Sequence, residues 1–212
     1  MFIKMKEIVE NYPQIKIKGV IHIGAHEGEE YADYKNIGVD KMIWVEANES
    51  LIANLSSKFL LDKNIQIINE AVFDEEKETT FKITNNMQSS SILNLKEHKV
   101  LFSDVLVIEE KKITTKRFDN LIIEKNIKID DYNFLNVDVQ GADLNVILSF
   151  GEYLDKIDFV YSEINIIEVY EGCHLLTEFD DVMKTKGFSR VMTHIYSDGG
   201  WGDALYIKDS LL

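Results

Sequence analysis

The chain has 212 residues, of which 45% are hydrophobic and 28% are charged, as is usual for a globular protein. Its formal charge of −14 repels phosphate backbones and anionic membrane surfaces, which argues against nucleic acid as a partner. Cys173 is the only cysteine, so a disulfide within the chain is excluded.

No apolar run approaches the roughly 20 residues of a membrane span, and charge interrupts the start where a signal peptide would be apolar. We therefore expect a cytoplasmic protein without an integral membrane segment. The length suits one domain over 1–212, because no Pro-rich or Gly/Ser-rich tract indicates a linker. Residues 1–16 are expected to form an N-terminal helical extension. The oligomeric state stays open, and a homo-oligomer is compatible with the sequence.

The hydrophobic pattern predicts strands and helices that alternate through most of the chain. The expected helices cover 2–11, 27–37, Asn48 or Ser50 to Phe59, 118–124, 141–150 and 176–186. The expected strands cover 17–23, 42–46, 65–68, 71–73, 78–83, 111–117, 134–139 and 157–163, with 84–103 irregular. Residues 188–196 and 204–208 should form an antiparallel hairpin across 197–202. This order predicts a mostly parallel sheet, covered by helices on both faces and closed by the hairpin.

The first strand runs directly into a glycine turn. Gly24 permits the tight turn, and Gly28 would let the backbone approach a ligand. The second strand ends in Glu46, which is placed to accept hydrogen bonds from two ribose hydroxyls. A dinucleotide-binding loop would carry glycine where this chain has His26, which disfavours NAD. The pattern therefore predicts a nucleoside cofactor without a pyrophosphate.

Five segments in order resemble the FkbM family of S-adenosylmethionine-dependent methyltransferases, and the resemblance covers roughly residues 17–208. They are IHIGAHEG at 21–28, WVEAN at 44–48, NEAV at 69–72, SSSIL at 89–93 and NVDVQGAD at 136–143. The family more often has Asp, Asn and Glu where this chain has His22, His26 and Asp143. The resemblance implies a Rossmann-like class I methyltransferase fold with a seven-stranded sheet, and S-adenosylmethionine as cofactor.

The cofactor contacts predicted from these segments lie in the glycine loop, at the end of the second strand, near the adenine and around the NVDVQG motif. They are His22, Gly24, Ala25, His26, Gly28, Glu46, Ala47, Glu70, Ala71, Asp138 and Gln140.

Asp138 ends an apolar strand at the edge where ligands of open α/β sheets bind. It could hold the methionine ammonium group or receive a proton from an acceptor hydroxyl. Glu163 ends the neighbouring strand and could share the site, but with no third ligand placed we predict no metal. His194 on the hairpin is an alternative general base. The candidates for acceptor binding are Ser90, Gln140, Asn165 and Trp201.

The family resemblance further implies O-methylation of a small-molecule or carbohydrate acceptor. The hypothesis is transfer to a sugar hydroxyl of a surface polysaccharide or of its nucleotide-sugar precursor. Two alternatives stay open. One is an N-methyltransferase of the same fold, and the other is a non-catalytic module that binds S-adenosylmethionine for a partner protein.

Overall fold

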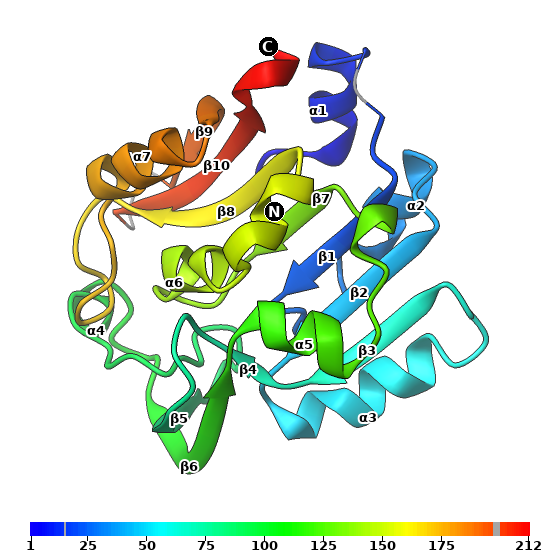
Figure 1. Ribbon diagram of the computed structural model, residues 1–212. Coiled ribbons are helices and arrows are strands. Elements are labelled where there is room, and N and C mark those ends of the chain that lie inside the picture. The colour runs from blue at the N-terminus through cyan, green and yellow to red at the C-terminus, as the bar shows by residue number, and fades with distance from the viewer. Residues whose placement is uncertain (15, 197–199) are drawn as a thin grey trace.

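A seven-stranded sheet forms the centre of the computed structural model, which describes residues 1–14, 16–196 and 200–212 (Figure 1). The strand order is β3-β2-β1-β7-β8-β10-β9. The strands are β1 (Gly19–Ile23), β2 (Lys41–Glu46), β3 (Ile65–Asn69), β7 (Phe134–Val137), β8 (Phe159–Asn165), β9 (Phe188–Ile195) and β10 (Trp201–Lys208).

Strands β1, β2, β3, β7 and β8 pair in parallel, whereas β10 runs antiparallel to both β8 and β9. The predicted mostly parallel sheet with a C-terminal antiparallel hairpin is therefore confirmed. The hairpin turn was predicted over 197–202, of which residues 197–199 lie outside the described part of the chain.

Helices cover both faces of the sheet because alternate residues of each strand are apolar on both sides. Val20 and Met42 lie in one core cluster with residues of α1 (Met5–Asn11), α2 (Tyr31–Asn36) and α3 (Glu49–Lys58). Ile21 and Ile43 lie in the other with residues of α5 (Phe118–Glu124), α6 (Asp143–Leu148) and α7 (Leu176–Thr185). Short 3₁₀ turns are η1 (Ile129–Asp131), η2 (Gly151–Lys156) and η3 (Asp209–Leu211). No helix in the described ranges is long and apolar enough to cross a membrane.

The N-terminal helix begins at Met5 rather than at residue 2. The two preceding residues are tied to the main sheet, because the Phe2 N–H donates to Asp203 and the Ile3 N–H donates to the Tyr161 hydroxyl. These bonds hold the segment before the helix against β8 and β10.

A second sheet has the order β4-β6-β5, with β4 (Ala71–Val72), β5 (Glu78–Thr84) and β6 (Val107–Lys116). The prediction of irregular structure over 84–103 is wrong in part, because this segment holds the helix α4 (His98–Leu101) and an antiparallel bridge from Ser91 to Lys82. The Ser91 hydroxyl also donates to the Gln140 carbonyl at 2.7 Å. This bond ties the second sheet to the end of β7.

Two helices begin later than predicted, at Tyr31 and at Asp143. Residues just before each helix have left-handed backbone: φ is 67° at Gly28, 59° at Gln140 and 97° at Gly141. A right-handed helix cannot pass through such residues, so each strand is followed by a loop before its helix starts. A further boundary differs at β8, which continues through Asn165, so Glu163 lies inside this strand.

Gly24 directly follows β1 and has φ at +86°, and a Cβ placed there would lie 1.8 Å from the Asp138 carbonyl oxygen. The turn after β1 is therefore pressed against the turn after β7. Gly38 has nearly the same φ, +85°, but a Cβ there would meet nothing within 4 Å. An alanine at Gly38 would cost only backbone strain, whereas an alanine at Gly24 would cost backbone strain and a steric clash as well.

We expect Gly38→Ala to lower the free energy of unfolding by about 1–2 kcal/mol, the cost of left-handed backbone. Gly24→Ala should cost more by about a further 1–3 kcal/mol, because the two turns must also move apart. Chemical denaturation of the ligand-free protein measures both. Equal losses for the two variants would contradict the contact between the turns.

Candidate functional site

Two cavities open at the carboxyl ends of the parallel strands, one of about 420 Å³ and the other of about 70 Å³. Their walls have several residues in common, namely Gly24, His26, Gln88, Asp138 and Gln140. The cavities therefore meet over the turns that follow β1 and β7. A ligand that fills the smaller cavity and reaches past Gly24 would enter the larger one beside Asp138.

The smaller cavity combines apolar walls with one buried acid. Val45, Val72 and Phe81 are among its apolar residues. Glu46 accepts the His26 N–H through Oε2 at 2.8 Å and the Asn48 N–H through Oε1 at 2.7 Å. Burial raises the pKa of Glu46, and the two backbone donors partly offset this rise. Each carboxylate oxygen keeps further acceptor capacity toward a ligand.

Several predicted residues do line this smaller cavity. Ala47, Glu70 and Ala71, which we predict to contact the cofactor, are on its wall. Ser90, which we assigned to the acceptor, lies here as well and does not line the larger cavity. Ser90 is therefore grouped with the predicted cofactor contacts rather than with the other candidates for acceptor binding.

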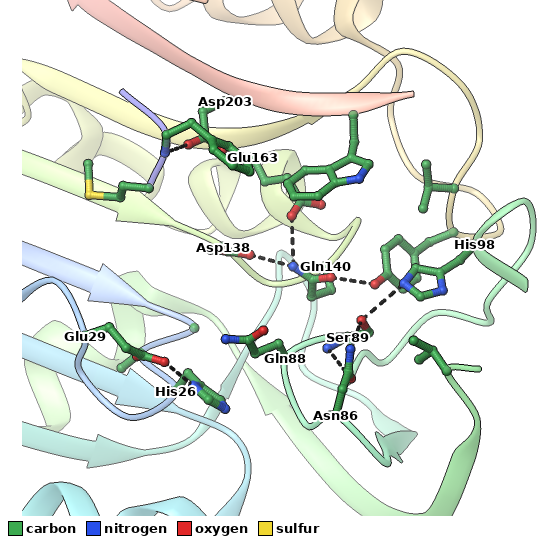
Figure 2. A pocket seen from close by; sticks show the side chains of 18 of the residues that line it. His26, Glu29, Asn86, Gln88, Ser89, His98, Asp138, Gln140, Glu163 and Asp203 are labelled. Carbon is green, nitrogen blue, oxygen red and sulfur yellow. Dashed lines mark hydrogen bonds and ion pairs between the residues drawn. The ribbon is translucent and has the colours of Figure 1, made fainter. Parts of the chain in front are cut away.

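Gln140 is the centre of the polar network in the larger cavity (Figure 2). Its amide nitrogen donates to Asp138 at 2.7 Å and to Glu163 at 2.8 Å, and its amide oxygen accepts from the Tyr170 hydroxyl at 2.5 Å. Asp143 stabilises the loop that carries Gln140. Its carboxyl accepts the backbone N–H groups of the residues before and after Gln140, at positions 139 and 141, at 3.0 Å each.

Asp138 is accessible from the cavity yet surrounded by protein. Burial, followed by the charge of Asp203, raises the pKa of Asp138 to about 6. Glu163 is only 5% exposed, and burial and the charge of Asp138 raise its pKa well above that of a free glutamate. The two carboxyls therefore lie close enough to affect each other's protonation, with the Gln140 amide between them.

The far wall is formed by β10 and by the segment before α1. Asp203 accepts the Phe2 N–H at 2.6 Å and the Tyr161 hydroxyl. The Phe2 and Trp201 rings lie 5.5 Å apart, and both line the cavity. This wall thus presents aromatic surface beside a buried carboxyl.

Three predicted residues are not on the wall of either cavity. His194 is exposed on β9 and stacks on the Phe2 ring at 5.0 Å. Asn165 is buried at the end of β8, opposite Trp201. A Cβ at Gly28 would lie 3.0 Å from the Phe59 ring, so Gly28 allows close packing on the residue that follows α3.

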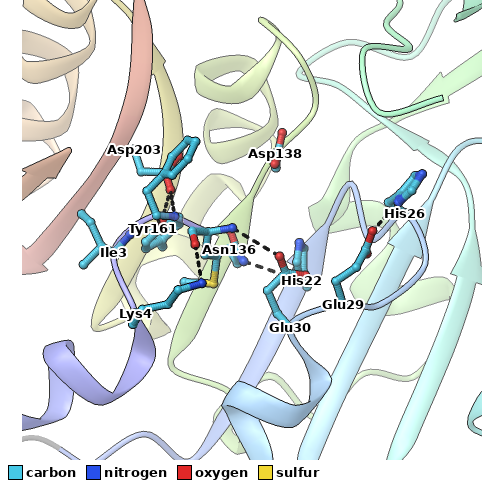
Figure 3. A network of polar contacts seen from close by, with 12 residues as sticks. Ile3, Lys4, His22, His26, Glu29, Glu30, Asn136, Asp138, Tyr161 and Asp203 are labelled. Atoms are coloured by element: carbon cyan, nitrogen blue, oxygen red, sulfur yellow. Dashed lines mark hydrogen bonds and ion pairs between the residues drawn. The ribbon is translucent and has the colours of Figure 1, made fainter. Parts of the chain in front are cut away.

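His22 forms part of the cavity floor together with a buried polar network (Figure 3). Its Nδ1 lies 3.1 Å from the Tyr34 hydroxyl, which also accepts the Asn136 amide at 2.7 Å. Burial lowers the pKa of His22 to about 4. His22 is therefore neutral near pH 7. Ala25, also predicted, lines the same cavity three residues further along the chain.

His26 differs from His22 because it has a charged partner. Its Nδ1 lies 2.6 Å from Glu29 Oε1, and this bond raises the pKa of His26. Burial acts to raise the pKa of Glu29, but the bonds to His26 and to backbone N–H groups outweigh it and lower that pKa to about 2. The two side chains form an ion pair at the junction of the cavities.

Some residues of the larger cavity were not found from the sequence. They include Tyr170, Asp203 and a hydrogen-bonded group in which Ser89 Oγ accepts from Asn86 at 2.9 Å and lies 3.1 Å from His98 Nε2. No group of three or more metal-ligating side chains that could hold a metal ion is found in the part of the chain that the structure describes.

The fold is similar to that of several solved structures. Fibrillarin from Aeropyrum pernix, with natively bound S-adenosyl-L-methionine, has a TM-score of 0.53 and 11% identity, covering 89% of this chain and 65% of that one. The magnesium protoporphyrin IX methyltransferase of Synechocystis PCC 6803, with bound S-adenosylmethionine, has a TM-score of 0.53 and 9% identity. The match covers 96% of this chain and 76% of that one. The ribosomal protein L11 methylase of Lactobacillus delbrueckii subsp. bulgaricus has a TM-score of 0.52 and 9% identity. The match covers 96% of this chain and 76% of that one.

At these identities the likeness shows the fold alone, which is that of the class I methyltransferases. A search of curated protein sequences finds no significant match. The methyltransferase FkbM domain matches residues 22–190, which includes both the glycine loop and the loop that carries Gln140. The chain therefore belongs to the FkbM family of S-adenosylmethionine-dependent methyltransferases, with S-adenosylmethionine as its cofactor.

Proposed function

We propose that this methyltransferase methylates a hydroxyl group of a sugar. The observation that carries the proposal is the position of Asp138, an acid of raised pKa on the wall that the two cavities share. An acceptor in the larger cavity can thus present a hydroxyl to Asp138 beside the smaller cavity. The bound cofactor supplies a methyl group on a positively charged sulfur.

The residues present fit S-adenosylmethionine. The apolar walls of the smaller cavity suit an adenine ring, and the buried Glu46 carboxylate suits two ribose hydroxyls. At Gly24 the backbone leaves no room for a Cβ, so the chain itself forms the floor where the cavities meet. The ion pair of His26 and Glu29 lies there and offers charged partners to the amino-acid end.

In the proposed mechanism Asp138 accepts the proton of the acceptor hydroxyl as the oxygen attacks. A carboxyl with a pKa of about 6 is a stronger base than an ordinary aspartate, yet it is mostly deprotonated at pH 7. Gln140 holds Asp138 in place through its amide N–H. Positioning of the two reactants supplies the larger part of the effect, up to about 7–11 kcal/mol for well-aligned groups.

The far wall supports a sugar as acceptor. A sugar ring has an apolar face that packs on aromatic side chains, and Phe2 and Trp201 present such surface. Its hydroxyls donate hydrogen bonds, and Glu163 and Asp203 are acceptors on the same side of the cavity. The formal charge of −14 also disfavours nucleic acid as the substrate.

Glu46→Gln should weaken binding of S-adenosylhomocysteine at least about tenfold, equivalent to about 1.4 kcal/mol. The amide cannot accept from both the ribose and the two backbone N–H groups that Glu46 now holds. Calorimetric titration measures the effect, with Glu49→Gln on the exposed start of α3 as the matched control. An unchanged dissociation constant would remove Glu46 from the ribose site.

Asp138→Asn should lower kcat by about 10²–10⁴-fold, the usual loss when a general base is removed. In the unmodified enzyme kcat/KM should rise with pH through about 6, because only the deprotonated carboxyl accepts a proton. The variant should lose this dependence while it still binds S-adenosylhomocysteine. Full activity, or the same pH profile, would show that Asp138 is not the base.

The acceptor class is tested by incubating the enzyme with deuterated S-adenosylmethionine and a panel of neutral and amino sugars. Tandem mass spectrometry then locates the label. We expect it on oxygen. Label on nitrogen would favour the N-methyltransferase alternative. Cofactor binding without transfer to any sugar would favour the non-catalytic module.

A further inference from the structure

The walls of the larger cavity are rich in carboxyl groups, which belong to Glu29, Glu30, Asp138, Glu163 and Asp203. The residues lining this cavity within the described ranges include no lysine or arginine, and the N-terminal ammonium of Met1 is paired with Glu30 at 3.4 Å. A phosphate or carboxylate group of a ligand would therefore meet like charge, without the Arg or Lys side chains that usually bind such groups.

These carboxyls fall into two groups (Figure 2). In the first group, Glu29 is paired with His26, Glu30 is paired with the N-terminal ammonium of Met1, and Asp138 lies on the wall shared with the smaller cavity. Glu163 and Asp203 line only the larger cavity and lie on the side opposite His26 and Glu29. They are thus separated from the groups that would lie next to the amino-acid end of the cofactor.

Glu163 and Asp203 are direct partners in the pairing of β8 with β10. Like charges at opposed positions of an antiparallel pair destabilise the sheet, and more so when they are buried. These two are 5% and 6% exposed. No cationic side chain forms an ion pair with either of them in the part of the chain that the structure describes.

Each of the two carboxyls has one oxygen in use and one free. Glu163 Oε2 accepts from Gln140, and Asp203 Oδ2 accepts from Phe2 and Tyr161. Glu163 Oε1 and Asp203 Oδ1 accept no hydrogen bond from any described residue, although both side chains are more than nine-tenths buried at the cavity wall. Two free carboxyl oxygens therefore border the same cavity.

We propose that the acceptor sugar carries a protonated amino group, which Glu163 and Asp203 bind, and that it carries no phosphate or carboxylate. The proposal rests on the proposed function and narrows its substrate class. An ammonium group has three N–H donors, enough for both free oxygens. Its positive charge favours the ionised form of Glu163, whose pKa is raised in the ligand-free protein by burial and by the neighbouring carboxyls. The absence of phosphate in this proposal excludes nucleotide-activated sugars as acceptors.

The same contact decides which atom is methylated. A nitrogen held as ammonium has no lone pair and cannot attack, so a hydroxyl of the sugar is the nucleophile. Its oxygen forms the new bond to the methyl carbon as the carbon–sulfur bond breaks. The hydroxyl proton passes to Asp138, and S-adenosylhomocysteine is the other product.

The test is calorimetric titration of the full chain saturated with S-adenosylhomocysteine. The probes are glucosamine, galactosamine and mannosamine, their N-acetyl derivatives, glucuronate and UDP-N-acetylglucosamine. We expect at least one amino sugar to bind about tenfold or more tightly than its N-acetyl derivative, because hydrogen bonds to an ionised donor are the stronger ones. The two anionic probes should show no binding in the larger cavity.

Glu163→Gln and Asp203→Asn should each bring the amino and N-acetyl sugars to within about threefold of one another, because the charge–charge part of the contact is lost. Exposed Glu152 provides a matched control, and Glu152→Gln should keep the preference. All variants should bind S-adenosylhomocysteine as before, which reports an intact fold; if one variant does not fold, the other decides.

Equal affinity for amino and N-acetyl sugars, tighter binding of UDP-N-acetylglucosamine, or no measurable binding of any amino sugar would overturn this inference. So would label on the amino nitrogen. Methylation of neutral sugars on oxygen with no preference for amino sugars would overturn it and leave the proposed function standing. Failure to methylate any sugar hydroxyl would overturn the proposed function itself.

Discussion

One side-chain amide holds the polar centre of this protein together. Gln140 lies between Asp138 and Glu163 and donates to both, while its oxygen accepts from Tyr170. Two carboxyls this close repel each other, and the shared amide N–H groups reduce the cost of keeping them there. The left-handed backbone of Gln140, supported by Asp143, is what lets one residue reach both acids.

The position of this amide follows from the parallel sheet. Strands β1 and β7 are neighbours, so the turns that follow them lie side by side, and Gly24 allows those turns to touch. Strand β8 brings Glu163 to the same edge, and the reversed direction of β10 brings Asp203 opposite it. Residues far apart in the chain thus converge, because strand direction and register fix where each side chain emerges.

The parallel sheet and part of the candidate site could be predicted from the sequence, because they depend on local patterns. Apolar strands, the glycine turn and the acids that follow the strands are local patterns. They led to the predictions for Glu46, Asp138 and Gln140, and the structure has these three residues on the cavity walls. Asp203 was missed because its place opposite Glu163 depends on the register of β10. Tyr170 was missed because its hydrogen bond to Gln140 joins two loops that are far apart in the sequence. His194 is the pairing partner of Asp203, but the Phe2 ring stacks on it and lines the cavity in its place, which a local pattern could not predict.

The run Gln88–Ser89–Ser90 crosses the boundary between the cavities. Gln88 borders both, Ser89 faces the larger and Ser90 the smaller. A molecule that immobilises one of these serines also restricts its neighbour through a single peptide unit. The two cavities therefore share one short wall segment, so a ligand in either cavity contacts residues that directly adjoin the other.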